Sequence, residues 1–239
     1  RYDVVHSFSR TRHQDLYRAG GGSHREFMRR TYGSNSSEET DAHGRQMLRS
    51  LSPRHRVLLS IEEAVFKDPR QRIQCASRFV ADSLISRYGV SPERILLLPN
   101  AVDATRFGSP EALETGRSLR IELDRKAERI WLFPASGWRR KGLRVLLESI
   151  AKIRDDGLRL WIAGRDDPEP WGKIANNLGV SERVRFLGHR DDLESLYGAV
   201  DGMVLPTRYD AFANVTLEAA ASGLPIITTT ANGAAEWLD

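Results

Sequence analysis

The stretch that decides the fold is residues 130–164, IWLFPASGWRRKGLRVLLESIAKIRDDGLRLWIAG. Its first five residues form an apolar run that ends at Pro134, which is typical of a buried strand. Residues 158–163 form a second run of the same kind. Between the two runs, five apolar residues recur at helical spacing: Leu143, Leu146, Leu147, Ile150 and Ile153. A strand, a helix and a strand in this order predict a βαβ unit with parallel strands.

The same alternation continues towards the end of the chain. Further apolar runs predict strands over residues 184–187, 202–205 and 226–229. Helical patterns lie between them, through residues 174–178, 191–199 and 214–222. Because strands and helices alternate with short connections, we expect residues 130–239 to form a doubly wound, Rossmann-like α/β domain with a parallel sheet.

An earlier βαβ unit is predicted upstream. Residues 72–76 are expected to form a short strand, a helix ending at Gly89 follows, and residues 95–98 form a fully apolar strand. Residues 3–6 read as the end of another buried strand. We therefore expect residues 1–104 to be part of a second Rossmann-like domain.

Two segments lack a regular pattern. Residues 33–45 are polar and rich in serine and glutamate, and they are expected to form an exposed loop. Residues 105–129 are charged and weakly periodic, with Gly108, Pro110 and Gly116 as interruptions. We expect residues 105–129 to be the linker between the two domains.

The composition limits the class of protein. A chain of 239 residues can bury a core, and its single cysteine, Cys75, excludes a disulfide scaffold and a cysteine-based zinc cluster. We predict no metal site and no cofactor. Without a run of 18 apolar residues, we expect no transmembrane helix and a cytoplasmic location. The chain begins at Arg1 and ends at Asp239 before a helix that would cover the sheet, so we expect truncation at both ends.

Positive charge is concentrated at the start of the chain. Residues 1–60 hold 11 of the 36 basic residues and 6 of the 32 acidic ones, a net charge of +5, and five of the six histidines. A basic segment of this kind indicates an anionic partner, either the acceptor or an anionic membrane surface in peripheral contact. A merely solvated basic surface explains the charge equally well.

Three loops at predicted strand ends are unusual: residues 135–142, 206–218 and 164–167. In an open parallel sheet, ligands bind at the carboxyl ends of the strands. The loop over residues 135–142 places Arg140 and Lys141 beside a helix N-terminus, which favours phosphate. After residues 202–205, small residues and the expected helix cap Asn214 would let a diphosphate approach.

Glu218 lies on the otherwise apolar helix that follows this second loop. A carboxylate there is costly to bury without a partner, which favours a pair of sugar hydroxyls as that partner. An ordinary exposed helix glutamate is the alternative, and on this residue alone it is the better explanation.

Residues 209–225, YDAFANVTLEAAASGLP, resemble the acidic motif of retaining, metal-independent glycosyltransferases of family GT4. Asp210 and Glu218 match the two carboxylates of this family motif. Four other segments fit the same family: residues 98–100 (LPN), 139–142 (RRKG), 162–164 (IAG) and 185–188 (RFLG). Residues 5–8 (VHSF) and 14–17 (QDLY) are similar to the lipopolysaccharide core branch, the heptose glucosyltransferases I.

The resemblance implies a GT-B fold, in which two Rossmann-like domains hold a nucleotide diphosphate sugar, mainly through the second domain. Arg140 and Lys141 match the pair that neutralises the diphosphate of the donor. Glu218 matches the carboxylate that binds the ribose hydroxyls. The other donor-binding positions implied by the family are Gly164, Phe186, Leu187, Asn214, Val215 and Thr216.

Three residues are implied to act on the sugar or the acceptor. Asp210 matches the carboxylate that holds the hydroxyls of the donor sugar, although the family usually has Glu there. Asp15 lies where the branch has an acidic residue on the acceptor side. His6, expected at the carboxyl end of a strand, is the second choice for that side. The glycine-rich loop at the start of the family does not occur in this chain.

The sequence therefore predicts a retaining hexosyltransferase. Its donor would be a nucleotide diphosphate sugar, with a UDP-sugar favoured, and its acceptor a saccharide or glycolipid such as the lipopolysaccharide core. Two alternatives remain open: a nucleotide- or nucleic-acid-binding module, and a sugar epimerase with the GT-B fold. Neither a Walker loop nor a G-x-G-x-x-G motif occurs, so we expect no nucleic-acid partner.

Overall fold

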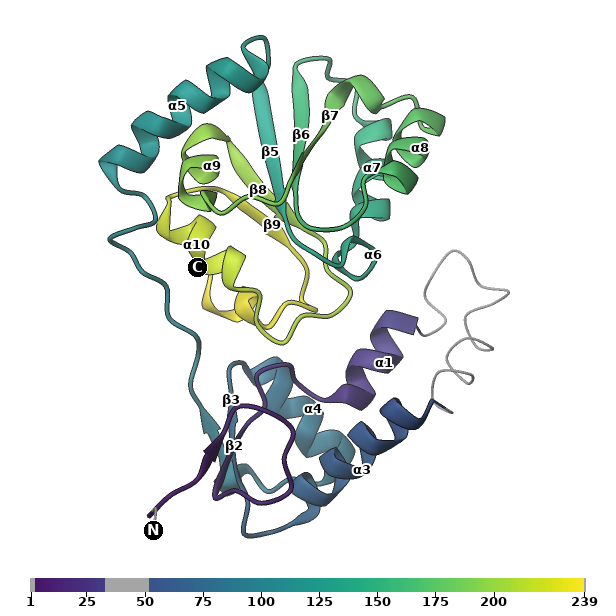
Figure 1. Cartoon of the computed structure of the whole chain (residues 1–239), viewed down its shortest axis with the longest axis vertical. Coiled ribbons are helices and arrows are strands. Elements are labelled where there is room, and N and C mark those ends of the chain that lie inside the picture. Colours follow the sequence, from purple (N-terminus) through teal and green to yellow (C-terminus); the bar gives the residue numbers. More distant parts are fainter. Residues whose placement is uncertain (1–2, 33–51, 239) are drawn as a thin grey trace. The chain divides into compact units, whose positions relative to one another are not determined.

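Two compact units make up the chain (Figure 1). A computed structural model describes residues 3–32 and 52–238, so the loop predicted over residues 33–45 lies outside the described residues. Unit 1 comprises Arg1–Asn100 with the short segments Tyr209–Phe212 and Ala231–Glu236. Unit 2 comprises Ala101–Arg208, Ala213–Thr230 and Trp237–Asp239. Each unit contains one parallel sheet with helices, which confirms the predicted α/β class.

Unit 1 is built on four parallel strands in the order β1-β2-β3-β4. They span His6–Ser7, Leu16–Arg18, Arg72–Cys75 and Ile95–Leu97. Since consecutive strands are neighbours, every connection steps in the same direction, and right-handed crossovers place the helices on one face. These helices are α1 (His24–Tyr32), α3 (Pro53–Lys67) and α4 (Arg78–Tyr88), with a 3-10 turn at Pro92–Arg94 before β4.

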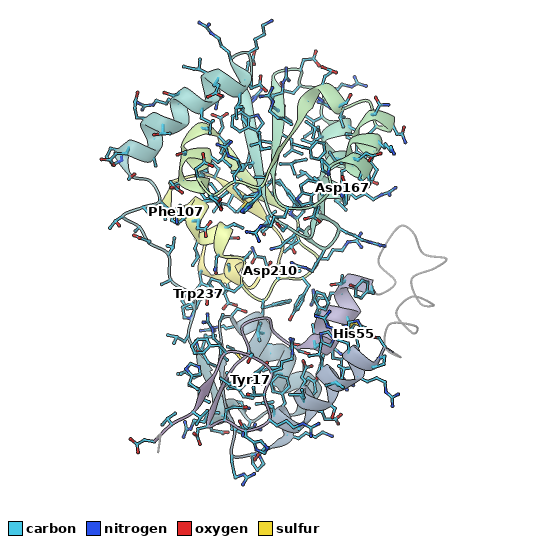
Figure 2. All side chains as sticks on the ribbon, viewed as in Figure 1. Tyr17, His55, Phe107, Asp167, Asp210 and Trp237 are labelled. Atoms are coloured by element: carbon cyan, nitrogen blue, oxygen red, sulfur yellow. The ribbon has the colours of Figure 1, made fainter. Side chains whose placement is uncertain are left out.

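A small apolar core joins these helices to the sheet. Tyr17, Ile73 and Cys75 are buried on the strands, and Figure 2 labels Tyr17. They belong to one cluster with residues of α3 and α4: Val65, Phe66, Val80 and Leu84. Burial raises the pKa of the Cys75 thiol to about 12, so Cys75 is a core residue, as the sequence indicated.

The start of unit 1 differs from its prediction. Residues 3–6 are exposed and His6 is the first residue of β1, so the buried strand expected there is absent from the described residues. Leu96 is 51% exposed because β4 is an edge strand rather than a fully buried one. The prediction for α4 is confirmed, and Gly89 ends that helix in the left-handed conformation with φ of 64°.

A buried carboxylate on α3 closes the N-terminus of α1. The Glu62 carboxylate accepts hydrogen bonds from the Ser23 hydroxyl (2.9 Å), the His24 N–H (2.5 Å), the Arg25 N–H (3.2 Å) and the Tyr88 hydroxyl. The first N–H groups of a helix lack partners within the helix and favour an anion. Unit 1 therefore supplies its own anion at this position.

A second buried carboxylate, Glu26, joins α1 to α4. Its side chain is 3% exposed and forms ion pairs with Arg29 (2.6 Å), Arg30 (2.6 Å) and Arg87 (2.6 Å). Burial acts to raise the pKa of Glu26, but the hydrogen bonds from Arg29 and Arg30 and the charge of Arg87 outweigh burial and lower the pKa to about 2. The charged form of Glu26 is thus the stable one.

Unit 2 contains five parallel strands and its helices in regular alternation. In chain order they are α5 (Pro110–Asp124), β5 (Arg129–Pro134), α6 (Trp138–Lys141), α7 (Leu143–Lys152), β6 (Leu158–Ala163), α8 (Glu169–Asn177), β7 (Val184–Gly188), α9 (Leu193–Ala199), β8 (Gly202–Leu205), α10 (Asn214–Ala221) and β9 (Ile226–Thr228). Every strand predicted from the sequence in this region is present within a residue or two at each end.

The strand order of unit 2, β7-β6-β5-β8-β9, places its helices on both faces of the sheet. The chain steps from β5 to β6 to β7 in one direction and then crosses back to β8 and β9. Right-handed crossovers consequently place α7 and α8 on one face and α9 and α10 on the other, as Figure 1 shows. None of the helices in residues 3–32 and 52–238 combines the length and the apolar character that crossing a lipid bilayer requires.

The segment predicted as a linker belongs to unit 2, so the prediction for residues 105–129 is wrong. Most of it forms α5, which begins where the Ser109 hydroxyl accepts a hydrogen bond from the Ala112 N–H (3.1 Å). Gly116 does not interrupt the helix. It lies so close to α9 that a Cβ at this position would come within 2.3 Å of the carbonyl carbon of Gly198. The boundary between the units follows Asn100.

Substitution Glu26→Gln tests the ion-pair cluster of unit 1. The pKa of Glu26 falls from 4.5 to about 2 on folding, so its charge stabilises the fold above pH 4.5, and this stabilisation is lost as the pH falls to about 2. We expect the variant to lose about 3 kcal/mol of unfolding free energy at pH 7 and little at pH 2, measured by urea unfolding.

The matched control is Glu63→Gln, because Glu63 pairs with Lys67 in an exposed position on α3. We expect the control to change stability by less than about 0.5 kcal/mol. Equal losses in the two variants would contradict the role given to Glu26.

Candidate functional site

The carboxyl edge of the unit 2 sheet holds a cavity of about 380 Å³. The strand order reverses between β5 and β8, and ligands of doubly wound sheets bind beside such a reversal. Twelve residues line the cavity: Pro134, Ala135, Ser136, Arg140, Lys141, Ala163, Gly164, Arg165, His189, Arg190, Leu193 and Val215. Its volume lies within the roughly 300–1,000 Å³ of small-molecule pockets.

The loops after β5 and β8 meet beside this cavity. The Arg208 N–H donates a hydrogen bond to the Arg140 carbonyl oxygen (2.9 Å). Gly142 has a φ of 88° and lies so close to Pro206 that a Cβ would come within 2.0 Å of the Pro206 carbonyl oxygen. The close approach requires glycine and fixes the end of the short helix that carries Arg140 and Lys141.

An internal carboxylate occupies the start of this short helix. Asp166, which follows β6, accepts hydrogen bonds from the Gly137 N–H (2.7 Å) and the Trp138 N–H (3.0 Å). The sequence analysis expected a helix N-terminus near this loop to favour phosphate. The Gly137 and Trp138 N–H groups at this helix start already donate to Asp166, so an anion would be bound by side chains of the loop rather than by these two N–H groups.

The lining of the cavity is cationic. Four of the lining residues are arginine or lysine, namely Arg140, Lys141, Arg165 and Arg190, and no lining residue is a carboxylate. Lys141 is only 8% exposed. Arg165 lies 3.1 Å from the His189 imidazole, measured between Nη2 and Nε2. Arg190 is paired with the Asp192 carboxylate (2.5 Å). Because the other three cations converge with it at the edge of one sheet, the cavity favours an anionic ligand.

The structure places the predicted residues near β7 differently from the sequence analysis. Phe186 packs on the Trp138 ring with 5.5 Å between centroids, and neither Phe186 nor Leu187 lines the cavity. The next residues, His189 and Arg190, line it instead. His189 and Arg190 could have been predicted from the sequence, because they follow the glycine that ends the strand.

Gly164 lies where the sequence analysis expected it, at the cavity. A Cβ on Gly164 would come within 2.1 Å of the Ala135 carbonyl oxygen and 2.5 Å of the Trp138 Nε1 atom. The glycine therefore serves close packing between the loops after β5 and β6. The sequence analysis missed Arg165, the residue that follows it and lines the cavity.

The start of α10 brings one predicted residue to the cavity. Val215 lines it, whereas Thr216 is fully buried and its N–H donates to the Ala213 carbonyl oxygen (3.0 Å). The prediction of Asn214 as the helix cap is wrong, because Asn214 is the first helical residue and Ala213 occupies the cap position. The binding roles predicted for residues 214–216 stay predictions.

Glu218 lies one turn into α10 and is partly buried. Its Oε2 atom accepts a hydrogen bond from the Tyr197 hydroxyl (3.1 Å), and it does not line the cavity. Burial raises the pKa of Glu218, while the Tyr197 hydrogen bond and the charge of Arg106 act in the opposite direction. The charged form of a carboxylate with a raised pKa destabilises the fold, and a ligand that donates hydrogen bonds to the carboxylate would offset this cost.

Asp210 belongs to unit 1, unlike Glu218. The backbone of Asp210 pairs with residues 231 and 233, through Asp210 N–H to the Ala231 carbonyl (2.9 Å) and Gly233 N–H to the Asp210 carbonyl (2.9 Å). Its Oδ1 atom accepts from the Phe212 N–H (3.1 Å). The local turn thus holds the carboxylate, and its predicted catalytic role stays a prediction.

The other two predicted catalytic residues lie at the amino edge of the unit 1 sheet. Asp15 precedes β2, and its Oδ2 atom accepts a hydrogen bond from the Val5 N–H (2.7 Å). His6 pairs in register with Leu16, the first residue of β2, so its predicted position at a carboxyl end is wrong. Ligands of parallel sheets bind at the opposite edge.

The described residues contain no group of three His, Cys, Asp or Glu side chains that could hold a metal ion. His13 and His24, the histidines with a conceivable ligand role, lie in no such group. The prediction that the site uses no metal stays a prediction, and the cationic side chains around the cavity are the groups that this part of the chain offers to an anion.

Comparisons with known proteins point to one family. Residues 128–239 match the family model described as Glycosyl transferases group 1. The lipopolysaccharide glucosyltransferase WaaG of Escherichia coli (strain K12) is 28% identical over 208 residues, which cover 84% of this chain and 55% of WaaG. A crystal structure of WaaG gives a TM-score of 0.79 at 25% identity and covers 99% of this chain and 62% of that one.

The structure of Anabaena Alr3699/HepE in complex with UDP gives a TM-score of 0.66 at 19% identity, over 95% of this chain and 63% of that one. These findings confirm the resemblance to group 1 glycosyltransferases and the GT-B class of the two parallel-sheet units. The chain spans about half the length of the curated relatives that it matches, 55% in the case of WaaG.

Removal of the Asp166 carboxylate tests its role in the loop after β5. Asp166→Ala leaves the Gly137 and Trp138 N–H groups without their acceptor, so we expect a loss of about 1 kcal/mol of stability. Amide hydrogen exchange at both positions should become faster. Asp156→Ala, at an exposed position in the same unit, is the control and should change neither quantity. Unchanged exchange in the Asp166 variant would contradict the assignment.

Glu218→Gln tests the cost of the buried carboxylate. Because its folded pKa is raised above 4.5, Glu218 lowers stability once the pH exceeds 4.5 and the group ionises. We expect the variant to have a higher melting temperature than the parent at pH 7 and an equal one at pH 4. Glu182→Gln, at an exposed position, should change neither value. A Glu218 variant that melts lower at pH 7 would show that the charge stabilises the fold.

Proposed function

We propose that this chain carries the donor-binding site of a retaining, metal-independent glycosyltransferase. The observation that carries the proposal is the cationic cavity at the strand-order reversal of unit 2, lined by Arg140 and Lys141 and by no carboxylate. The donor would be a nucleotide diphosphate sugar, for which a UDP-sugar is favoured because a structural neighbour was solved with UDP. The acceptor would be a saccharide or glycolipid, as for the lipopolysaccharide glucosyltransferase WaaG.

The diphosphate of the donor would lie against the side chains of the loop after β5. At neutral pH it carries about two negative charges, and departure of the nucleoside diphosphate is the step in which further charge develops. Arg140 can donate two parallel hydrogen bonds to phosphate oxygens, and Lys141 supplies a compact charge. Since both are held between Gly137 and Gly142, they need little reorganisation to meet the phosphates.

The proposed reaction breaks the bond between the anomeric carbon and the phosphate oxygen. The oxygen of an acceptor hydroxyl forms a new bond to that carbon on the same face, and the hydroxyl proton goes to the departing phosphate. The products are a glycoside and a nucleoside diphosphate, so atoms and charges balance without a cofactor. Fixed cations stabilise the leaving group in the way that a metal ion does in other enzymes.

The remaining roles follow the family resemblance. Glu218 would accept hydrogen bonds from the ribose hydroxyls, which would offset the cost of its burial. Asp210 would hold the hydroxyls of the donor sugar. The resemblance assigns Asp15 and His6 to the acceptor side, and both lie at the amino edge of the unit 1 sheet. We place the reaction in the cytoplasm, with the basic first region towards an anionic acceptor or membrane face.

Thermal shift with four donors tests this proposal. We expect UDP-glucose to raise the melting temperature more than the GDP-, ADP- or dTDP-linked sugars. A ligand that binds the folded state stabilises it by about 2.7 kcal/mol when its concentration is a hundredfold above Kd. Lys141→Gln removes a charge-assisted contact worth about 1.5–3 kcal/mol, so the variant should bind about 10- to 100-fold more weakly.

The matched control is Lys152→Gln, which removes the same charge at an exposed position of α7. It should respond to the donor as the parent does. The proposal fails if no donor stabilises the parent, or if Lys141→Gln responds like the control. Hydrolysis or epimerisation of the sugar without an acceptor would favour the epimerase alternative instead.

A further inference from the structure

Two arginines near the carboxyl edge of the unit 1 sheet, Arg10 and Arg18, form no ion pair with a carboxylate of residues 3–32 or 52–238. β1 and β2 are parallel, with His6 opposite Leu16 and Ser7 opposite Tyr17. The residues that follow Ser7 therefore run beside Arg18, the last residue of β2, at one edge of the sheet. Arg10 belongs to this segment. Both arginines are partly buried.

The Arg18 guanidinium is held in place by neutral groups. Its central carbon lies 5.4 Å from the centre of the Phe8 ring, and its Nη2 atom donates a hydrogen bond to the Asn100 side-chain oxygen (2.5 Å). The Nε atom is buried and has no hydrogen-bond partner among the described residues. Arg18 is thus oriented by stacking and by one amide, and no carboxylate of the described part of the chain pairs with it.

Arg10 is in a similar state. Its Nε atom is also buried without a hydrogen-bond partner among the described residues. Burial, and then the charge of Arg10, lower the pKa of His24, which places Arg10 near the loop between β2 and α1. A buried unpaired donor in a native protein commonly marks a position that a bound water or ion satisfies.

Other partly buried arginines of unit 1 have partners. Arg30 and Arg87 form ion pairs with Glu26. Arg94 donates hydrogen bonds to three carbonyl oxygens, of Val65, Phe66 and Gln71. A partly buried guanidinium without an anion is costly, because its charge loses water without gaining a partner. Arg10 and Arg18 therefore differ from these arginines, because each has a buried Nε atom without a partner among the described residues.

Three acidic residues of unit 1, Glu62, Glu26 and Asp15, already have hydrogen-bond or ion-pair partners of their own. The N-terminus of α1, which would otherwise compete, is closed by Glu62. The only acidic residue between Ser7 and Gly22 is Asp15, which lies at the amino edge and binds the Val5 N–H. At Gly21 a Cβ would meet no atom within 4 Å, so the loop beside Arg18 is open.

We infer that Arg10 and Arg18 form a binding site for a phosphomonoester. Two guanidinium groups balance the charge of about −2 that such a group carries, and each can donate paired hydrogen bonds to its oxygens. The site belongs to unit 1 and is separate from the donor cavity of unit 2. It does not require the proposed function, but with that function it assigns a phosphate group to the acceptor.

Isothermal titration of the full chain with inorganic phosphate at pH 8 and constant ionic strength tests the inference. Every protein carries Lys141→Gln, which weakens phosphate binding in the donor cavity. We expect Arg10→Gln and Arg18→Gln each to weaken binding by about 10-fold or more. Arg18→Lys keeps the charge but loses the paired hydrogen bonds, so its affinity for phosphate should lie between those of the parent and Arg18→Gln.

The matched control is Arg12→Gln, which removes an exposed arginine from the same loop. It should bind phosphate as the parent does, and the melting temperatures without phosphate identify any variant that fails to fold. The inference is wrong if the parent does not bind phosphate, or if Arg10→Gln and Arg12→Gln lose binding equally. If Arg18→Gln does not fold, the comparison of Arg10→Gln with Arg12→Gln decides.

Two further measurements separate this site from the proposed function and identify the source of the phosphate. In proteins that keep Lys141, UDP binding should be the same with and without Arg10→Gln, so failure of UDP to bind the unsubstituted chain would contradict the proposed function alone. Co-sedimentation with phosphatidylcholine vesicles containing phosphatidic acid, lost in Arg10→Gln and Arg18→Gln, would assign the phosphate to a lipid. Binding of inorganic phosphate without co-sedimentation would assign it to a soluble acceptor.

Discussion

The handedness of the crossovers in unit 2 is the constraint on which the candidate site depends. The chain lays down β5, β6 and β7 in one direction and then crosses back to add β8 on the far side of β5. Because parallel strands connect in a right-handed sense, the helices before and after this reversal cover opposite faces of the sheet, and the loops after β5 and β8 meet at its carboxyl edge. The cavity at this edge is a consequence of the topology, and the local sequence decides only its charge.

In both units, an internal carboxylate occupies a helix start that the sequence alone would offer to an anion. Glu62 binds the first N–H groups of α1, and Asp166 binds those of α6. Helix starts of this kind cannot also bind a phosphate through the same N–H groups. At these two helix starts, an anion would have to be bound by nearby arginine and lysine side chains rather than by the helix N–H groups.

The sequence predicted unit 2 well because its strands are apolar runs and its helices are strongly periodic. It failed for α5 because Gly116 looks like an interruption, whereas a close contact with Gly198 requires a glycine there. It failed at the start of unit 1 because β1 and β2 have two and three residues, too few for a periodic signal.

The cations Arg140 and Lys141 were found because they follow a clear strand. Their neighbours Arg165 and His189 were missed because a ring of cations from three loops becomes visible only after folding.

Several residues assigned to ligand binding are costly in the absence of a ligand. Burial raises the pKa of Glu218, and among the described residues the buried Nε atoms of Arg10 and Arg18 have no hydrogen-bond partner. A fold selected for stability alone would replace such groups by apolar ones, since burying charge is rarely repaid. Native proteins place these costs at functional sites, where a ligand supplies the missing partner. The two anion sites inferred here, one in each unit, therefore rest on the same physical argument, and each can be tested without the other.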